Sequence, residues 1–386
     1  MFNLSLEELK KLGANITANE IKQQPDLWKE TLNNFINRQD EIKDFIGEIK
    51  SKYDYIEVIF TGAGTSAYVG ETLLPQLNTS NSSGKVKFLS YPTTDIVSNP
   101  KSFFKESVPT ILVSFARSGN SPESVAAVKL AKKIIKNLYQ ITITCAKDGK
   151  LALSAKNDEK NLLILQPERA NDQGFAMTGS YSCMYLTSLL IFDDNSLNNK
   201  KIWIDELIVA GKSVINKYDV IQKIADIDVD RIIYLGSGSY YGLAHETQLK
   251  VLELTAGIKA TMYETILGFR HGPKSFVNEQ TAIIIYESTN EYTQKYDYDL
   301  INEISQDNIA KLVVKVGSNN EKIDKVENFV INISDHVPDG YRVLPYLLFG
   351  QIYALICSVN VGNTPDTPSE NGTVNRVVKG VTIHDF

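Results

Sequence analysis

The first fifty residues carry the hydrophobic pattern of amphipathic helices. Residues 5–8 and 17–20 also fit the capping box, in which a hydroxyl and a glutamate three positions later satisfy the free amides of a helix start. The apolar positions recur at roughly helical spacing and are Leu27, Leu32, Phe35, Ile36, Ile42, Phe45 and Ile46. The pattern predicts a helical segment over residues 1–50.

From about residue 55 short apolar runs alternate with amphipathic stretches such as 122–136. The first series of runs occupies residues 55–62, 85–90, 109–116, 139–146 and 161–166. The second series occupies 231–238, 258–264, 281–288, 310–318 and 329–334. Strands that alternate with helices predict a parallel sheet covered on both faces. We therefore expect one α/β architecture twice in the chain.

The two series correspond residue by residue at their first strand. VIFTGAGTS at 58–66 matches IIYLGSGSY at 232–240, and each is a strand followed by two glycines and a helix start. A chain of 386 residues is also long enough for two domains. We expect a helical segment over 1–50 and two doubly wound domains with mainly parallel sheets over 51–212 and 213–386.

Composition and charge argue against several classes of protein. A net charge of −6 and a pI near 5.5 disfavour a nucleic-acid surface. The apolar region 346–359 is shorter than a bilayer span and contains Gln351, which predicts a buried helix. Three widely spaced cysteines and the lack of a secretory pattern at the N-terminus predict a cytoplasmic protein with reduced core thiols.

A loop rich in small polar residues follows the strand-like run 110–113 and reads SFARSGNSPES over 114–124. Ser118, Ser121 and the glycine between them offer hydroxyl and amide donors, and Pro122 suits the first position of a helix. Arg117 could add a bidentate contact to an anion. A plain capped turn has the same composition, and Glu123 would repel an anion unless it points away.

The second copy of this loop reads TAIIIYESTNEYTQK and lacks the glycine, the arginine and the proline. A turn needed only by the fold should persist in both copies, so the difference favours a ligand in the first copy. The earlier GAGTS loop lacks the third glycine of a dinucleotide fingerprint, and we expect no nicotinamide cofactor. Thr65 and Ser66 would instead add hydroxyls at the same sheet crevice.

These motifs together resemble a known family. GAGTS and RSGNS, repeated in degenerate form, resemble the sugar isomerase (SIS) domain, in tandem as in the isomerase half of glucosamine-6-phosphate synthase. SFARSGNSPESV, LGFRHGPKSFV and NGTVNRVVKGVTIH resemble the tagatose-6-phosphate ketose/aldose isomerases, also described as galactosamine-6-phosphate deaminase/isomerases. The motifs span most of the chain from about 55 to 384.

The resemblance implies roles for particular residues. Glu253 falls on the carboxylate that transfers protons, His271 on the histidine that opens the sugar ring, and Lys379 on a lysine that reaches the sugar. Arg270 stands where the synthase has a lysine, and Arg117 where it has a glutamine. The residues expected to line the sugar site are Lys379, Glu246, Lys250 and Arg270. Those expected to bind phosphate are Thr65, Ser66, Arg117, Ser118 and Ser121.

The residue spacing agrees with acid/base chemistry. Glu246, Lys250 and Glu253 lie at i, i+4 and i+7, on one helix face, although a solvated salt-bridged face would have the same spacing. A carboxylate and a histidine suffice to move a proton between C1 and C2 of a sugar, so no cofactor is expected. His245 and Glu246 begin a zinc-like HExxH pattern, but Leu249 replaces its second histidine, and we expect no metal.

The C-terminal tail is too apolar to remain free in water. We expect it to dock, which would bring Lys379 to a site formed elsewhere. Its apolar residues are Val374, Val377, Val378, Val381 and Ile383.

The expected function is that of a cytoplasmic, homo-oligomeric enzyme with an active site shared between subunits. It would convert galactosamine 6-phosphate to tagatose 6-phosphate and ammonia through hydrolysis of an imine, or interconvert an aldose and a ketose 6-phosphate. Alternatives are a non-catalytic sugar-phosphate sensor and an enzyme of gluco-series or fructosamine 6-phosphates. Neither nucleic acid nor a membrane is an expected partner.

Overall fold

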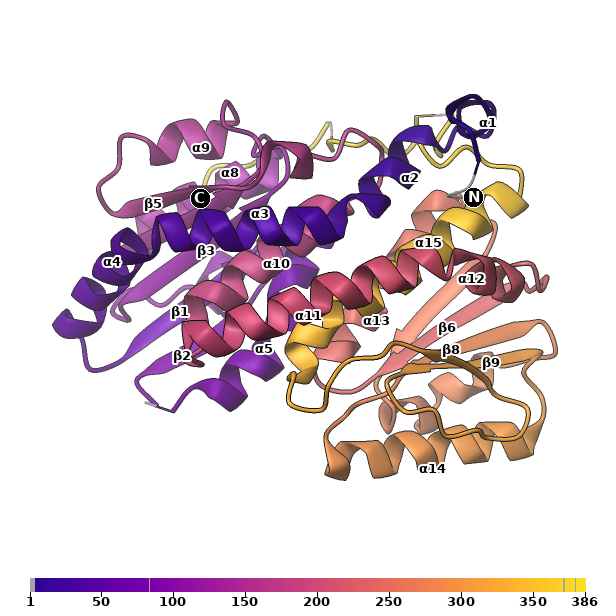
Figure 1. Cartoon of the computed structure of the whole chain (residues 1–386). Helices are drawn as coiled ribbons and strands as arrows, with labels where there is room; N and C mark the ends of the chain where they lie inside the picture. The colour runs from indigo at the N-terminus through magenta and orange to yellow at the C-terminus, as the bar shows by residue number, and fades with distance from the viewer. Residues whose placement is uncertain (1–3, 83, 371, 379) are drawn as a thin grey trace. The chain divides into compact units, whose positions relative to one another are not determined.

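The computed structural model describes residues 4–82, 84–370, 372–378 and 380–386 (Figure 1). These residues form two compact units, each with one sheet. The first-sheet unit comprises residues 26–172, 179–201 and the described part of 372–386, and the second-sheet unit comprises 4–25, 173–178 and 202–370. The units follow spatial contact and do not test the limits 51–212 and 213–386, which remain a prediction.

The predicted N-terminal helices are present as α1 (Leu6–Lys11), α2 (Asn15–Lys22), α3 (Gln24–Asn37) and α4 (Gln39–Lys52). Ser5 and Glu8 form the expected capping box. The second expected box is wrong, because α2 begins at Asn15 and Thr17 lies inside it. The side chains of Thr17 and Glu20 instead form hydrogen bonds with residues distant in the sequence. Thr17 donates to the Asp366 carboxylate, and Glu20 accepts from backbone amides of residues 173 and 174.

The first sheet has the strand order β2-β1-β3-β4-β5. Its strands are β1 (Ile56–Thr61), β2 (Val86–Ser90), β3 (Thr110–Ala116), β4 (Leu138–Thr144) and β5 (Asn161–Leu165), and they pair in parallel. From β1 the chain moves to the edge strand β2 and then returns to β3 on the other side of β1. Such a reversal leaves a crevice at the carboxyl ends of the two strands between which the order reverses, here β1 and β3.

Both faces of this sheet are buried, which explains why its strands read as continuous apolar runs. Ile59 and Leu112 pack in one cluster with residues of α6 (Thr93–Ser98) and α8 (Pro122–Ile134). The next residue of β1, Phe60, contacts Phe115 and also Phe192 of α10 (Gly179–Phe192). Alternate residues of a strand point to opposite faces, so the two clusters lie on opposite sides of the sheet.

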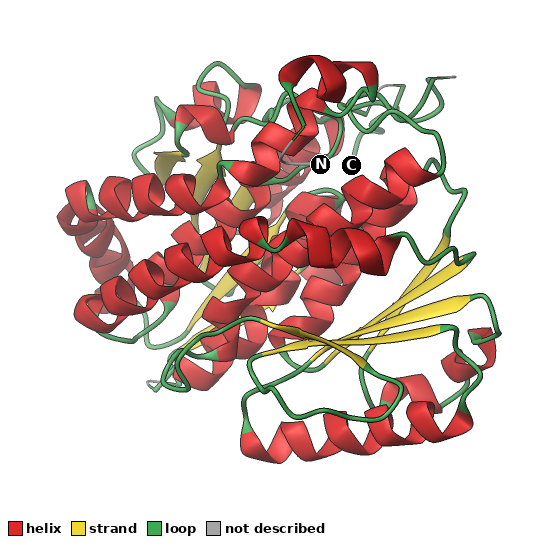
Figure 2. Cartoon of the chain, turned by 45° about the vertical axis from the view of Figure 1, so that its right-hand side comes forward, coloured by secondary structure: helices red, strands yellow, loops and turns green. Residues whose placement is uncertain are grey.

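The second sheet has the order β10-β9-β8-β6-β7. Its strands are β6 (Arg231–Gly236), β7 (Ala260–Glu264), β8 (Thr281–Tyr286), β9 (Leu312–Gly317) and β10 (Glu327–Val330). Helix α14 (Glu291–Asp307) covers one face, and α13 (Ser239–Leu254) and α15 (Asp339–Asn360) cover the other (Figures 1 and 2). Here β6 and β8 flank the reversal of strand order.

The structure confirms that the architecture occurs twice. Gly64 before α5 and Gly238 before α13 have nearly equal backbone angles, with φ of +54° and +59°. Residues other than glycine rarely adopt this conformation. Tyr234 and Tyr286 stack at 6.1 Å where Phe60 and Phe115 stack at 5.9 Å in the first sheet. The remaining helices are α5 (Thr65–Ser80), α7 (Pro100–Phe103), α9 (Lys150–Ala155), α11 (Leu197–Asn216) and α12 (Tyr218–Ala225).

Helix α15 is the one described helix that is long and apolar enough to cross a membrane. It has 22 residues because it begins at Asp339, so the length expected from residues 346–359 was too short. The most apolar 18-residue window of this helix is nevertheless 89% buried inside the protein. Gln351 accepts a hydrogen bond of 2.6 Å from the buried Gln24 side chain. Burial therefore identifies α15 as a core helix, as predicted.

The three cysteines are free and buried. Burial raises the pKa of both Cys183 and Cys357 to about 12, and it also raises the pKa of Cys145. Thiols that stay protonated are poor nucleophiles. Their expected place in the core is confirmed.

Candidate active site

Two helix starts meet the crevice of the first sheet. Thr65 and Ser66 open α5 directly after β1, and both are 5% exposed. The loop after β3 leads to α8, where Pro122 occupies the first turn and Ser121 precedes it. Because β1 and β3 are neighbouring parallel strands, these two helix starts lie at the same edge of the sheet. The free amides of a first helical turn attract anions.

The loop from Arg117 to Ser121 is held by contacts of several kinds. The buried Arg117 donates from Nη2 to the carbonyl of Arg376 at 2.8 Å. The Ser118 hydroxyl accepts from the Asn120 amide at 3.3 Å, and the Asn120 side chain accepts from the Lys150 amide at 3.1 Å. The Ser121 side chain does not cap α8 within the described chain. Contacts of Arg117 and Asn120 thus hold the loop in place, and Ser118 and Ser121 lie just before the start of α8.

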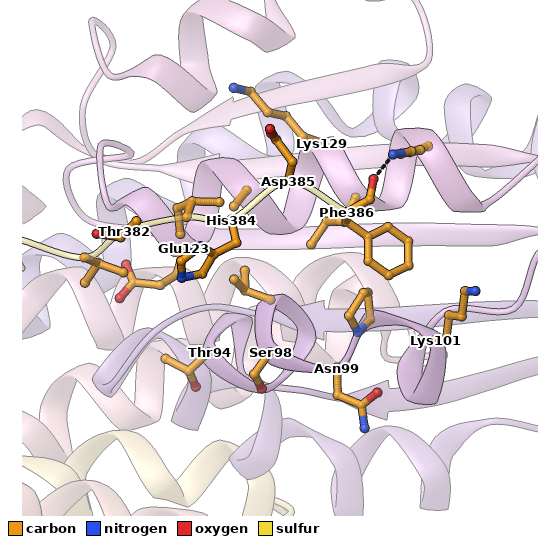
Figure 3. Close-up of a pocket in the computed structure, with 17 residues that line it drawn as sticks. Thr94, Ser98, Asn99, Lys101, Glu123, Lys129, Thr382, His384, Asp385 and Phe386 are labelled. Carbon is orange, nitrogen blue, oxygen red and sulfur yellow. Dashed lines mark hydrogen bonds between the residues drawn. The ribbon is translucent and has the colours of Figure 1, made fainter.

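Glu123 faces a groove that the C-terminal residues border. The groove lies between α6, α8 and residues 381–386, has a volume of about 1060 Å³, and places Glu123 beside Thr382 and His384 (Figure 3). An anion in the loop requires this glutamate to point away from it. Glu123 Oε2 is buried and has no hydrogen-bond partner among the described residues.

The C-terminal residues dock onto the first-sheet unit, as expected, through polar and apolar contacts. The Arg376 carbonyl accepts from Arg117, and its guanidinium donates to the Asp172 carbonyl. Lys133 donates to the Phe386 carbonyl, and its ammonium lies 5.5 Å from the Phe386 ring. The apolar residues contribute unevenly: Val374 is 56% and Val378 48% exposed, whereas Val377 is half-buried and Val381 and Ile383 line the groove. Lys379 lies outside the described residues.

Helix α13 carries a buried group of three charges. Lys250 is 1% exposed, lies 3.4 Å from Glu246 Oε1 and also contacts Glu253 Oε1. The Glu246 side chain is fully buried and that of Glu253 is 19% exposed. Burial lowers the pKa of Lys250, but Glu246 and Glu253 outweigh it and raise the pKa above its usual value. The alternative of a solvated salt-bridged face is therefore wrong.

The loop with the FRHGP motif follows β7. Gly272 has φ of +113°, which only glycine adopts without strain. Arg270 pairs with Glu303 of α14 at 2.7 Å, and Lys274 pairs with the same carboxylate. His271 is exposed, and its ring makes no hydrogen bond, ion pair or ring contact within the described residues. The loop is therefore fixed on α14 while its histidine faces outward.

The structure thus brings the predicted residues together in two separate groups. The phosphate candidates Thr65, Ser66, Arg117, Ser118 and Ser121 belong to the first-sheet unit. The candidates Glu246, Lys250, Glu253, Arg270 and His271 belong to the second-sheet unit. His245 stacks on Tyr263 at 3.9 Å, and the described residues contain no group of three His, Cys, Asp or Glu that could hold a metal.

Sequence reasoning missed three residues that position these groups. Arg376 holds Arg117 through its carbonyl, Asp172 accepts from Arg376, and Glu303 holds Arg270. Arg376 lies within the quoted motif NGTVNRVVKGVTIH, which was a usable signal. Asp172 and Glu303 have no feature in the sequence that distinguishes them from other acidic residues.

Two parallel sheets with a strand–glycine–helix start in each define a tandem sugar isomerase domain protein. No model of a known protein family matches the chain. The D-galactosamine-6-phosphate deaminase AgaS of Escherichia coli is 38% identical over 380 residues, which cover 96% of each chain. The chain therefore belongs to the AgaS family of sugar-phosphate deaminases and isomerases, which are enzymes.

Solved structures agree with this family. A Clostridium novyi protein assigned as a tagatose-6-phosphate ketose/aldose isomerase is 42% identical, with a TM-score of 0.95 and coverage of 100% of this chain and 99% of that one. The tagatose-6-phosphate ketose/aldose isomerase of Escherichia coli is 35% identical, with a TM-score of 0.87 over 96% of each chain. Glucosamine-6-phosphate deaminase of Thermotoga maritima, at 20% identity and a TM-score of 0.67, shares the fold.

Proposed function

We propose that the protein converts D-galactosamine 6-phosphate to tagatose 6-phosphate and ammonia. The observation that carries this proposal is the buried Glu246–Lys250–Glu253 group on α13. Burial of charged side chains costs the fold desolvation energy that ion pairing only partly returns. Such a group is therefore better explained by chemistry than by stability. The names of the AgaS relatives supply the substrate.

The phosphate would bind at the two helix starts of the first sheet. Thr65, Ser66, Ser118 and Ser121 offer hydroxyls there, and the first turns of α5 and α8 offer amides. Arg117 would hold the loop through the Arg376 carbonyl and add positive charge. In this scheme Arg117 positions the loop even where it does not contact the phosphate.

Proton transfer would use two side chains. His271 opens the sugar ring, and Glu253 then removes the C2 proton and returns it to C1. When C2 carries an amino group, this transfer leaves an imine at C2, and water hydrolyses the imine to the ketose and ammonia. When C2 carries a hydroxyl, the same transfer isomerises an aldose to a ketose. Glu246 and Lys250 would orient Glu253, and Arg270 and Lys379 would contact the sugar.

The working enzyme would be a cytoplasmic homo-oligomer with shared active sites. The exposed ring of His271 supports this proposal, because it is free to act on a substrate bound by a partner subunit. Mixing and refolding the inactive variants Glu253→Gln and His271→Asn should restore part of the activity if each site draws on two subunits. Mixed variants that stay inactive would contradict a site that takes Glu253 and His271 from different subunits. The three buried, free thiols support the proposed location of the protein in a reducing compartment, the cytoplasm.

The reaction is tested with purified protein and three substrates: galactosamine 6-phosphate, glucosamine 6-phosphate and tagatose 6-phosphate. Ammonia release and ketose formation are measured separately for each. Ammonia and ketose formed in equal amounts from the galactosamine compound are the expected result. Turnover of the glucosamine compound alone would assign a gluco-series enzyme. Tight binding without any turnover would contradict catalysis and favour a sensor.

A further inference from the structure

The crevice of the second sheet already holds an anion, which is a carboxylate of the protein itself. Asp339, the first residue of α15, accepts a hydrogen bond of 2.6 Å from the Ser288 hydroxyl and another of 2.6 Å from the Thr289 hydroxyl. The Thr289 amide donates to the same carboxylate at 3.1 Å. Ser288 and Thr289 lie two and three residues after the end of β8 at Tyr286, at the reversal of strand order.

A fourth donor comes from the other side of the crevice. The Tyr240 hydroxyl donates to Asp339 Oδ1 at 3.3 Å. Tyr240 is the second residue of α13, as Ser66 is the second residue of α5. The donors to Asp339 thus come from the helix after the first strand and the loop after the third strand. These are the same two places that supply the phosphate candidates in the first sheet.

The first repeat carries an uncharged residue where the second carries Asp339, and its α10 start is instead capped by the buried Asp172 carboxylate, which accepts from the Gly179 and Ser180 amides. Helices α10 and α15 each follow the fifth strand of their sheet, and each packs on the helix after the first strand. Near their starts the sequence reads Thr178-Gly179 in the first repeat and Asp339-Gly340 in the second. Only the second repeat therefore supplies an anion from this position.

We propose that the second domain keeps an oxyanion site of the sugar-phosphate type, and that the Asp339 carboxylate fills it as a built-in ligand. The native chain then binds one sugar phosphate although it contains two repeats. A phosphate-sized oxyanion takes the second site once the Asp339 carboxylate is removed. A polar cavity of about 770 Å³ borders the loop and offers room; Thr289, Ser318 and Asn319 line it, together with the carboxylates of Glu206, Glu287, Glu291 and Asp335.

The charges around the site set a limit on its affinity. Glu287 lies close to the loop, but Lys315 faces it at 3.7 Å. The buried Arg342, one turn further along α15, donates to the Ser334 carbonyl at 2.6 Å and to the Ser318 hydroxyl. Asp297 accepts from the Ser288 amide. Since carboxylates remain nearby, we expect weaker phosphate binding than in the first domain.

The test uses thermal unfolding in inorganic phosphate against chloride at equal ionic strength. In a Ser118→Ala/Ser121→Ala background, which removes the hydroxyls of the first loop, the melting temperature should not respond specifically to phosphate. Addition of Asp339→Ala should create a phosphate-dependent rise in melting temperature, because a ligand that binds only the folded state stabilises it. Further addition of Thr289→Ala should abolish that rise.

Asp299→Ala is the matched control, because it removes the same charge from an exposed position on α14 that does not line the cavity. It should create no phosphate response. A folded Asp339→Ala protein without a response overturns the proposal. If Asp339→Ala is unfolded in chloride, recovery of the fold in phosphate supports the proposal, and failure to recover overturns it. Absence of a phosphate response in the unmodified chain would count only against the first-domain site.

Discussion

Asp297 should make the stability of the protein depend strongly on pH. Its side chain is fully buried, and Oδ2 accepts from the Ser288 amide at 2.8 Å, while Oδ1 has no hydrogen-bond partner in the described structure. Burial, and then repulsion from Glu287 and Asp339, raise the pKa of Asp297 from 3.8 to about 7, against the lowering effect of the Ser288 amide. The folded state therefore favours the protonated acid.

The size and sign of the effect follow from this pKa. Each pKa unit is worth about 1.4 kcal/mol, so the difference between 3.8 and about 7 corresponds to about 4 kcal/mol. Below pH 3.8 the acid is protonated in both states and costs nothing. Between pH 3.8 and 7 only the unfolded state ionises, so stability falls as pH rises. Above pH 7 the loss is complete and constant.

Urea unfolding of the unmodified protein and of Asp297→Asn measures this loss. The variant should gain stability relative to the unmodified protein as pH rises from 4.5 to about 7, by about 3 kcal/mol of the full effect. Asp299→Asn, at an exposed position on the same helix, should show no such trend. A difference between Asp297→Asn and the unmodified protein that stays constant with pH, or that grows toward acid, would refute the reasoning.

Three further predictions concern the candidate active site. Glu253→Gln should lower kcat about 10²- to 10⁴-fold in the ammonia-release assay, and a larger loss in Glu246→Gln would move the base to Glu246. Ser118→Ala should raise KM for the sugar phosphate and leave kcat nearly unchanged, and an unchanged KM would remove this hydroxyl from the phosphate site. Lys250→Met should reduce the free energy of unfolding by about 3 to 5 kcal/mol, because it leaves two carboxylates without their cation; a loss below 1 kcal/mol in urea unfolding would contradict that pairing.

Much of the fold could be predicted because it depends on periodicity. The apolar runs at 109–116 and 281–288 coincide with β3 and β8, since both strands are buried on both faces. Repeated glycines before α5 and α13 marked the duplication, because both positions need a positive φ. The loop after β3 was found for a similar reason, since proline and small polar residues have a preferred place at helix starts.

The contacts within the candidate site could not be predicted, since they depend on partners distant in the sequence. Arg117 and Arg376 are 259 positions apart, and neither residue type specifies a backbone carbonyl as its partner. The spacing of Glu246, Lys250 and Glu253 places them on one helix face but does not determine which element covers it. Glu246 and Lys250 are buried rather than solvated, which only the packing of the whole second-sheet unit determines.

The difference between the two repeats has a physical explanation in the second loop. This loop lost the glycine and arginine of its counterpart but kept two hydroxyls, Ser288 and Thr289, which Asp339 engages. A carboxylate carried by the chain is always present at high effective concentration, so an arginine that attracts a free anion is no longer needed there. In the first loop the corresponding position near α10 is the uncharged Thr178. Under the proposed function the bound phosphate supplies the negative charge there, and Arg117, which donates to the Arg376 carbonyl, holds the loop that binds it.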